Sequence, residues 1–167
     1  MSNKQFNASR LIDLSHNIFD GLVTYKGLPA PIICDYLSRE QSQKVYGDEY
    51  QVQIGKIEMV TNTGTYLDSP FHFDAQGNDL ADLTLDMLAD LPAVVIDVID
   101  EIEVGVQHFN DVDVMGKAVL VKTNWSQHWN TEQYFENHAY LTEEAARLLV
   151  KRGAKLVGID SHNIDDT

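Results

Sequence analysis

The chain has 167 residues, enough for one domain with a sizeable core. It has 12 Lys and Arg against 26 Asp and Glu, which gives a formal net charge of −14. Because such a surface repels phosphate groups, we expect neither nucleic acid nor a membrane surface as a partner. The single cysteine, Cys34, excludes an intrachain disulfide and a cysteine-based zinc site.

The opening residues lack the apolar stretch of a signal peptide, and no apolar run approaches the ~20 residues that span a bilayer. We therefore expect a cytoplasmic protein. Cys34 lies in the apolar run PIIC, which predicts a small buried hydrophobic residue rather than a nucleophile.

The first half of the chain predicts strands and loops. Residues 10–16 alternate between apolar and polar side chains, as in a short strand. Residues 21–31 are marked by Gly and Pro and predict a surface flap that carries Tyr25. Residues 50–60 predict a strand, with a bulge near Gly55 where the apolar parity changes.

The second half alternates helices and strands, so the fold class is α/β. Helices are predicted at 84–91, ended by Pro92, and at 142–152, capped by Thr142 and ended by Gly153. Apolar runs predict strands at 93–99, buried on both faces, at 117–123 and at 155–160. Since there is no repeat or long linker, we expect a single domain over residues 1–167.

Residues 62–72, NTGTYLDSPFH, hold the candidate site. Asp68 and His72 are four residues apart with Pro70 between them, a spacing that favours a rigid extended turn over a helix. Gly64 allows a positive φ or a close approach. A carboxylate and an imidazole on such a turn can share a metal ion or exchange protons. The spacing alone leaves a structural role for both side chains equally open.

The residues around Asp68 and His72 favour a functional role for them over a structural one. Five positions, Gly64, Thr65, Asp68, Pro70 and His72, fit the pattern HxGTHxDxPxH, and this segment resembles the motif of the cyclase family, which includes bacterial kynurenine formamidase and isatin hydrolase. The resemblance extends to DLSHNI at 13–18, GLPAP at 27–31, TNWSQHW at 123–129 and LTEEAARLLVKRGAKLVGID at 141–160. It covers nearly the whole chain.

This resemblance implies a swivelling β/β/α domain with a mixed sheet and flanking helices, hydrolysis of a small amide, lactam or lactone, and a homodimer or higher oligomer. It also implies metal binding by the three histidines and the aspartate of the motif, usually to a zinc or manganese pair. A further His and Glu follow the GID strand in the family. A metal ion there polarises the carbonyl and lowers the pKa of a bound water.

The sequence departs from that pattern at two metal positions, where Asn62 and Tyr66 replace histidines. Losing two imidazoles weakens metal binding and shifts the preference toward hard ions such as Mn²⁺ or Mg²⁺. The sequence also ends at Thr167, before the family's later His and Glu, as in a fragment or a naturally shortened protein. We therefore expect at most one divalent ion, Mn or Zn, rather than a complete two-zinc site.

Three functions stay open at this point. In the first, Asp68 and His72 bind one metal ion. In the second, the site works without metal, with Asp68 or His72 as base and Tyr66 as acid. In the third, the domain is a catalytically silent binding or regulatory subunit. We assign catalysis to His72, Asp68 and Tyr66, and metal binding to Asp68 and His72. The residues assigned to binding a small-molecule substrate are Asn62, Thr65, His16 and Tyr25.

Other residues have weaker claims to function. His162 could replace a lost metal ligand, near Asp160, whereas Asp165 and Asp166 are expected to form a solvated tail. The aromatic residues near the same segment are expected in the core or in a dimer contact, with stacking on a substrate as the alternative: Trp125, Trp129, Tyr134 and Phe135. Three histidines in polar stretches are expected at the surface: His108, His128 and His138.

Overall fold

A computed structural model describes residues 12–167 and divides the chain into two compact units. The first unit consists of Met1–Leu22 and Pro29–Leu67, and the second of Val23–Leu28 and Asp68–Thr167. The short segment Val23–Leu28 thus belongs to the second unit although both of its neighbours in the chain belong to the first. Whether the units form the single domain expected over residues 1–167 stays a prediction.

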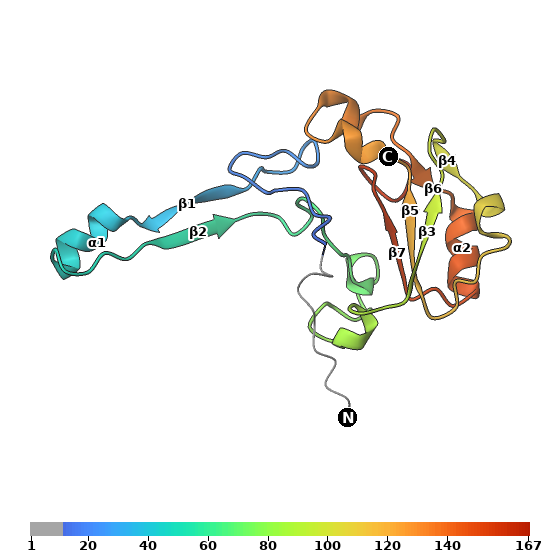
Figure 1. Ribbon diagram of the computed structural model, residues 1–167, viewed down its shortest axis with the longest axis horizontal. Helices are drawn as coiled ribbons and strands as arrows, with labels where there is room; N and C mark the ends of the chain where they lie inside the picture. Colours follow the sequence, from blue (N-terminus) through green and yellow to red (C-terminus); the bar gives the residue numbers. More distant parts are fainter. Residues whose placement is uncertain (1–11) are drawn as a thin grey trace. The chain divides into compact units, whose positions relative to one another are not determined.

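The first unit contains a two-stranded antiparallel ribbon, β1 (Ile32–Leu37) and β2 (Ile54–Glu58), joined through helix α1 (Arg39–Tyr46) (Figure 1). Ser38 caps α1 in a capping box with Gln41, which explains why a largely polar segment forms a helix here. Ser42 is fully buried and its hydroxyl accepts a hydrogen bond from the amide of Val52 at 3.0 Å. That bond ties the helix to the segment leading into β2.

Three predictions for this unit are corrected. The strand expected at 50–60 is shorter, and the irregular register lies between Asp35 and Leu37, so the extra residue belongs to β1, opposite Gly55. Residues 12–16 form no strand, whereas Arg10 and Leu11 lie outside the described residues. Cys34 is exposed, because the apolar run around it lies in a ribbon rather than in a core.

The second unit is built on a parallel sheet in the order β3–β5–β7 (Figure 1). Its strands are β3 (Ala93–Asp97), β5 (Ala118–Lys122) and β7 (Leu156–Ile159), which confirms three predicted strands. Helix α2 (Glu143–Lys151) has Thr142 as its N-cap and is followed by Gly153 with φ +78°, as predicted.

One face of this sheet packs against α2 to form the core. Val119 and Leu149 are completely buried there, together with Phe109. The opposite face is more open, since Val95 is 54% exposed. The prediction that strand 93–99 is buried on both faces is therefore wrong: alternate residues, not all of them, point into the core.

Shorter elements complete the second unit. A small parallel pair joins β4 (Glu103–Val104) to β6 (Tyr140–Leu141). Single 3₁₀ turns are present at η2 (Pro70–His72), η3 (Leu85–Met87), η4 (Val106–Phe109), η5 (Trp125–His128) and η6 (Glu132–Phe135). The helix predicted at 84–91 is only the turn η3, which has no side-chain cap and is followed by Asp90 at φ +54°. None of the helices in the described residues is long and apolar enough to cross a membrane.

Candidate functional site

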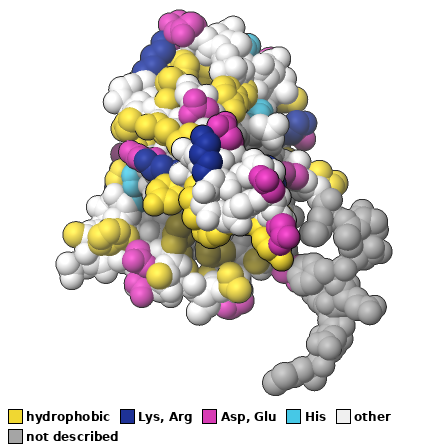
Figure 2. All heavy atoms as spheres, turned by 90° about the vertical axis from the view of Figure 1, so that its left-hand side faces the viewer, with side chains coloured by type: hydrophobic (Ala, Val, Ile, Leu, Met, Phe, Trp, Pro, Cys, Tyr) yellow, Lys and Arg dark blue, Asp and Glu magenta, His cyan; other side chains and the backbone are white. Residues whose placement is uncertain are grey.

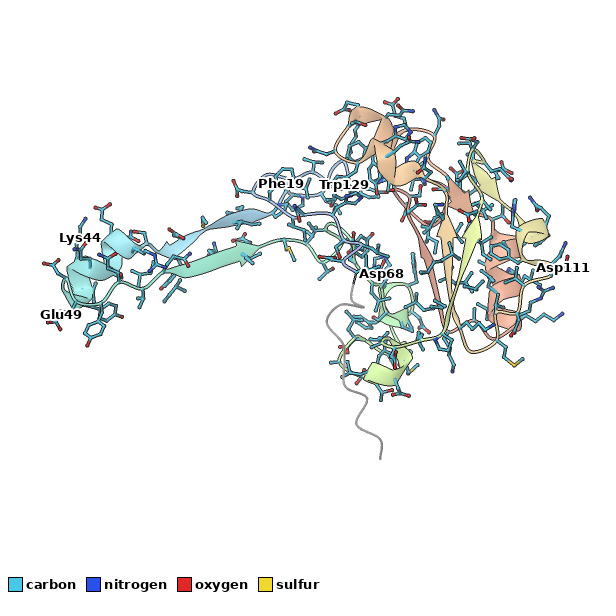
Figure 3. All side chains as sticks on the ribbon, viewed as in Figure 1. Phe19, Lys44, Glu49, Asp68, Asp111 and Trp129 are labelled. Carbon is cyan, nitrogen blue, oxygen red and sulfur yellow. The ribbon has the colours of Figure 1, made fainter. Side chains whose placement is uncertain are left out.

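The motif of residues 62–72 crosses from the first unit to the second between Leu67 and Asp68. Figure 3 places Asp68 in the irregular segment that follows β2 and precedes β3.

In the first unit the motif forms a tight turn after β2. Gly64 has φ +72°, and a Cβ at this position would lie 2.9 Å from Cγ1 of Ile18, so both backbone conformation and packing require glycine. The hydroxyl oxygen of Thr65 accepts a hydrogen bond from the backbone amide of His16 at 3.3 Å. The structure thus brings together His16 and Thr65, two of the residues assigned to substrate binding, through the backbone of His16.

The other two candidates in this half are partly accessible. The side chain of Asn62 accepts a hydrogen bond from the hydroxyl of Thr61 at 3.1 Å, and Tyr66 is 42% exposed. The neighbouring Thr63 is buried and donates its hydroxyl to the carbonyl of Val60 at 2.7 Å. Thr63 therefore anchors the turn, while Asn62 and Tyr66 keep surface that a ligand can reach.

In the second unit the motif continues as η2, with Pro70 at its first position. The turn is held by the amide of Phe71, which donates to the carbonyl of Asn78 at 3.1 Å. Gly77 lies so close to Pro70 that a Cβ would approach its carbonyl carbon to 2.8 Å. The segment is a short 3₁₀ turn rather than the extended turn predicted, and it is fixed by packing against the loop that follows.

Asp68 and His72 face each other across this turn. Oδ1 of Asp68 lies 3.8 Å from Nδ1 of His72, and the two side chains are 39% and 40% exposed. The distance is too long for a strong hydrogen bond. The arrangement leaves a carboxylate and an imidazole side by side and open to solvent, which suits shared binding of an ion or transfer of a proton.

The separation between Asp68 and His72 is close to the separation of two side chains that bind one metal ion. Two donors that bind one ion at about 2.1 Å each lie about 3–3.5 Å apart, so a small side-chain rotation would let Asp68 and His72 share an ion. Among residues 12–167 no group of three or more His, Cys, Asp or Glu side chains is arranged to hold a metal. The described residues therefore fit two coordination positions, the same two that the motif retains.

The segment after β7 makes structural hydrogen bonds, and one of its partners, His138, is more buried than predicted. The carboxylate of Asp160 holds the loop after β5 by hydrogen bonds. Its Oδ1 accepts hydrogen bonds from the amide and the hydroxyl of Thr123 at 2.6 and 2.7 Å, and its Oδ2 accepts one from the amide of Asn124 at 2.9 Å. His138, expected at the surface, is 3% exposed, and its Nε2 lies 2.9 Å from the hydroxyl oxygen of Thr167. Asp165 and Asp166 are exposed, as predicted.

His162 is enclosed by aromatic rings rather than by carboxylates. Its ring centroid lies 4.9 Å from that of Tyr25, 5.4 Å from Tyr134 and 5.2 Å from Phe135. Tyr134 is buried, as predicted for this aromatic group. Burial lowers the pKa of His162 to about 4, and His138 and Lys26 act in the same direction. The contact between Tyr25 and His162 was not predicted, because the two residues lie near opposite ends of the sequence.

The structure belongs to the α/β class and carries the motif of residues 62–72, and comparisons with known proteins identify its family. The Cyclase family model matches residues 12–166. A kynurenine formamidase of Bacillus cytotoxicus is 32% identical over 162 residues, which cover 95% of this chain and 71% of the relative. The chain belongs to the cyclase family of formamidase-type hydrolases.

Solved structures show the same fold. A structure described as a potential metal-dependent hydrolase with cyclase activity superposes with a TM-score of 0.73 at 23% identity, covering 93% of this chain and 70% of that one. Isatin hydrolase A from Labrenzia aggregata gives a TM-score of 0.65 at 21% identity, covering 92% of this chain and 68% of that one. The predicted cyclase-type α/β fold is thereby confirmed.

Proposed function

We propose that this chain is a metal-assisted hydrolase of a small amide, lactam or lactone, and that Asp68 and His72 do its chemistry. The observation that carries the proposal is their placement: a solvent-accessible carboxylate and imidazole 3.8 Å apart, at the two metal-ligand positions of the family motif that are retained. Relatives named kynurenine formamidase and isatin hydrolase suggest a cyclic or formylated aromatic amide as the substrate class.

A divalent ion, Mn or Zn, held by Asp68 and His72 would supply Lewis acidity and a bound water with a lowered pKa. The carboxylate of Asp68 would offer the ion a hard, negatively charged oxygen, and an oxygen that does not bind the ion can accept a proton. The imidazole of His72 offers one neutral nitrogen lone pair, which would bind the ion or, in the mechanism without metal, accept a proton. Tyr66 is proposed as the acid, and the residues proposed to bind the substrate are Asn62, Thr65, His16 and Tyr25.

A screen of formamides, lactams and lactones tests this proposal, beginning with a formamide of kynurenine and with isatin. We expect turnover that a chelator abolishes and added Mn²⁺ or Zn²⁺ restores. Chelator-resistant turnover would instead indicate the metal-free mechanism, with Asp68 or His72 as base.

A silent binding subunit is the second candidate. It is favoured by Asn62 and Tyr66, which stand where the family motif has histidines. Binding of a screened compound without hydrolysis, unchanged by Asp68→Ala, would support this candidate and reject the hydrolase. The exposed, unpaired Cys34 is compatible with the reducing cytoplasm expected for either function.

We also propose that the chain assembles with a second copy through the arm formed by β1, α1 and β2. A two-stranded ribbon is marginally stable by itself. This arm exposes large apolar side chains, and Figure 2, viewed from the side of the arm, shows hydrophobic side chains at the surface. The most exposed of them are Tyr36 (74%), Val45 (69%), Tyr50 (68%) and Ile57 (66%). Covering them with the same surface of another copy would remove them from water.

Light scattering after size exclusion tests the assembly. Wild type is expected at a multiple of 18.8 kDa. Tyr36→Lys combined with Ile57→Lys is expected to shift the mass to the monomer, because two charges would have to be buried. Asp111→Lys, an exposed position in the second unit (Figure 3), is the control and should assemble normally. A monomeric wild type would contradict the proposal.

A further inference from the structure

Tyr25 and Lys26 of the segment Val23–Leu28 contact other parts of the second unit. The ring of Tyr25 lies over that of His162 with an interplanar angle of 32° and a centroid distance of 4.9 Å. Lys26 forms an ion pair with Glu132 at 2.8 Å, and its ammonium lies 5.0 Å from the ring centroid of Phe135. Within the segment, the amide of Leu28 donates to the carbonyl of Tyr25 at 3.2 Å. The attachment thus depends on contacts with η6 and with the segment after β7.

The imidazole of His162 is the centre of this attachment. Besides Tyr25, it contacts the rings of Tyr134, Phe135 and His138 at centroid distances of 5.2–5.4 Å. Its Nδ1 is buried and has no hydrogen-bond partner among the described residues. A neutral imidazole tolerates such surroundings, whereas an imidazolium would bring a charge and a buried N–H donor without an acceptor.

The neighbouring charges do not offset a proton on His162. From the Val23–Leu28 segment, Lys26 faces it with a positive charge, and Glu132 of η6 is already paired with that ammonium. From the other side comes His138, whose Nδ1 lies 3.1 Å from the carbonyl oxygen of Ala139 and whose Nε2 lies 2.9 Å from the Thr167 hydroxyl. The remaining titratable neighbours are the phenols of Tyr25 and Tyr134.

We propose that His162 is a pH-operated latch: as a neutral ring it holds Tyr25 and the Val23–Leu28 segment on the second unit, and once protonated it releases them. The direction of the pH effect follows from the coupling between release of the segment and protonation of His162. Because burial lowers the pKa of His162 to about 4 while a released imidazole titrates near 6.5, release takes up a proton and becomes easier as the pH falls from about 6.5 to about 4. Between pH 7 and pH 5 the equilibrium for release should rise about 20-fold.

NMR on protein with labelled histidine, tyrosine and phenylalanine rings tests the latch in the full chain. In wild type, His162 should titrate well below the ordinary value of an imidazole, and its NOEs to the ring of Tyr25 should disappear over the same pH range. In His162→Phe, which keeps a ring but cannot take a proton, NOEs between the substituted phenyl ring and Tyr25 should persist throughout that range. His108→Gln, remote in sequence and paired with Glu101, is the matched control and should behave as wild type.

The methyl signals of the fully buried Leu149 report whether the core stays folded. Release with unchanged Leu149 signals supports a local latch. Three results would overturn it: titration of His162 at the ordinary value with intact NOEs, equal loss of the NOEs in His162→Phe, or loss of the Leu149 signals together with those of Tyr25.

Discussion

Asp68→Asn is expected to lower kcat/KM for hydrolysis by about 1,000-fold, because it removes at once a metal ligand and a proton acceptor. Asparagine has nearly the same shape as aspartate, so the turn η2 should form as before, and the loss would reflect charge rather than folding. The measurement is steady-state kinetics on the best substrate of the screen, with circular dichroism to compare folding.

Asp74→Asn is the matched control for this prediction. Asp74 lies two residues beyond His72, and its Oδ1 accepts a hydrogen bond from the amide of Gln76 at 2.9 Å, which an asparagine oxygen can also accept. Its kcat/KM should stay within about twofold of wild type, as for a surface change away from the reacting groups. Equal activity of Asp68→Asn and wild type would remove Asp68 from the mechanism.

Asp160→Ala is expected to have the largest effect on stability, about 3 kcal/mol, because it leaves two backbone amides and two hydroxyls without their acceptor. The donors come from Thr123, Asn124 and Ser126, in the loop that follows β5. Asn124 holds φ +65°, a left-handed conformation that asparagine adopts more readily than most residues, and its amide donates to Asp160. The free energy of unfolding from urea titrations is the quantity to measure.

A control for Asp160 lies five residues further on. Asp165 is exposed and accepts one hydrogen bond from the side chain of Asn163 at 2.7 Å, so Asp165→Ala should change the free energy of unfolding by less than about 0.5 kcal/mol. If the two alanine variants were equally stable, Asp160 would not be the support of the β5 loop.

Elements with strong local signals could be predicted from the sequence. Helix α2 has a capping threonine, acidic residues in its first turn and a terminal glycine, and the apolar runs of β3, β5 and β7 form a parallel sheet. By contrast, α1 was missed, since its sequence REQSQKVY has little apolar periodicity and depends on the Ser38 capping box. The exposure of Cys34 likewise depends on what covers β1, which local sequence does not encode.

In the candidate site, too, features with a local sequence signal could be predicted, and features that depend on distant partners could not. The motif singled out Asp68 and His72 through a resemblance over nearly the whole chain, and their role stays a prediction. The burial of His138 and the stacking of His162 on Tyr25 depend on partners distant in sequence. Polar surroundings in the sequence suggested an exposed His138, and only the folded chain brings Thr167 and the aromatic rings around it.

Asp68 and His72 are proposed to form the metal-holding, reacting part of this cyclase-family hydrolase. Elemental mass spectrometry tests it most directly, on wild type and Asp68→Ala purified side by side without chelator. About one Mn or Zn per chain is expected in wild type, bound by two retained protein donors and solvent, and none in the variant. No metal in wild type, or equal metal in both proteins, would contradict it.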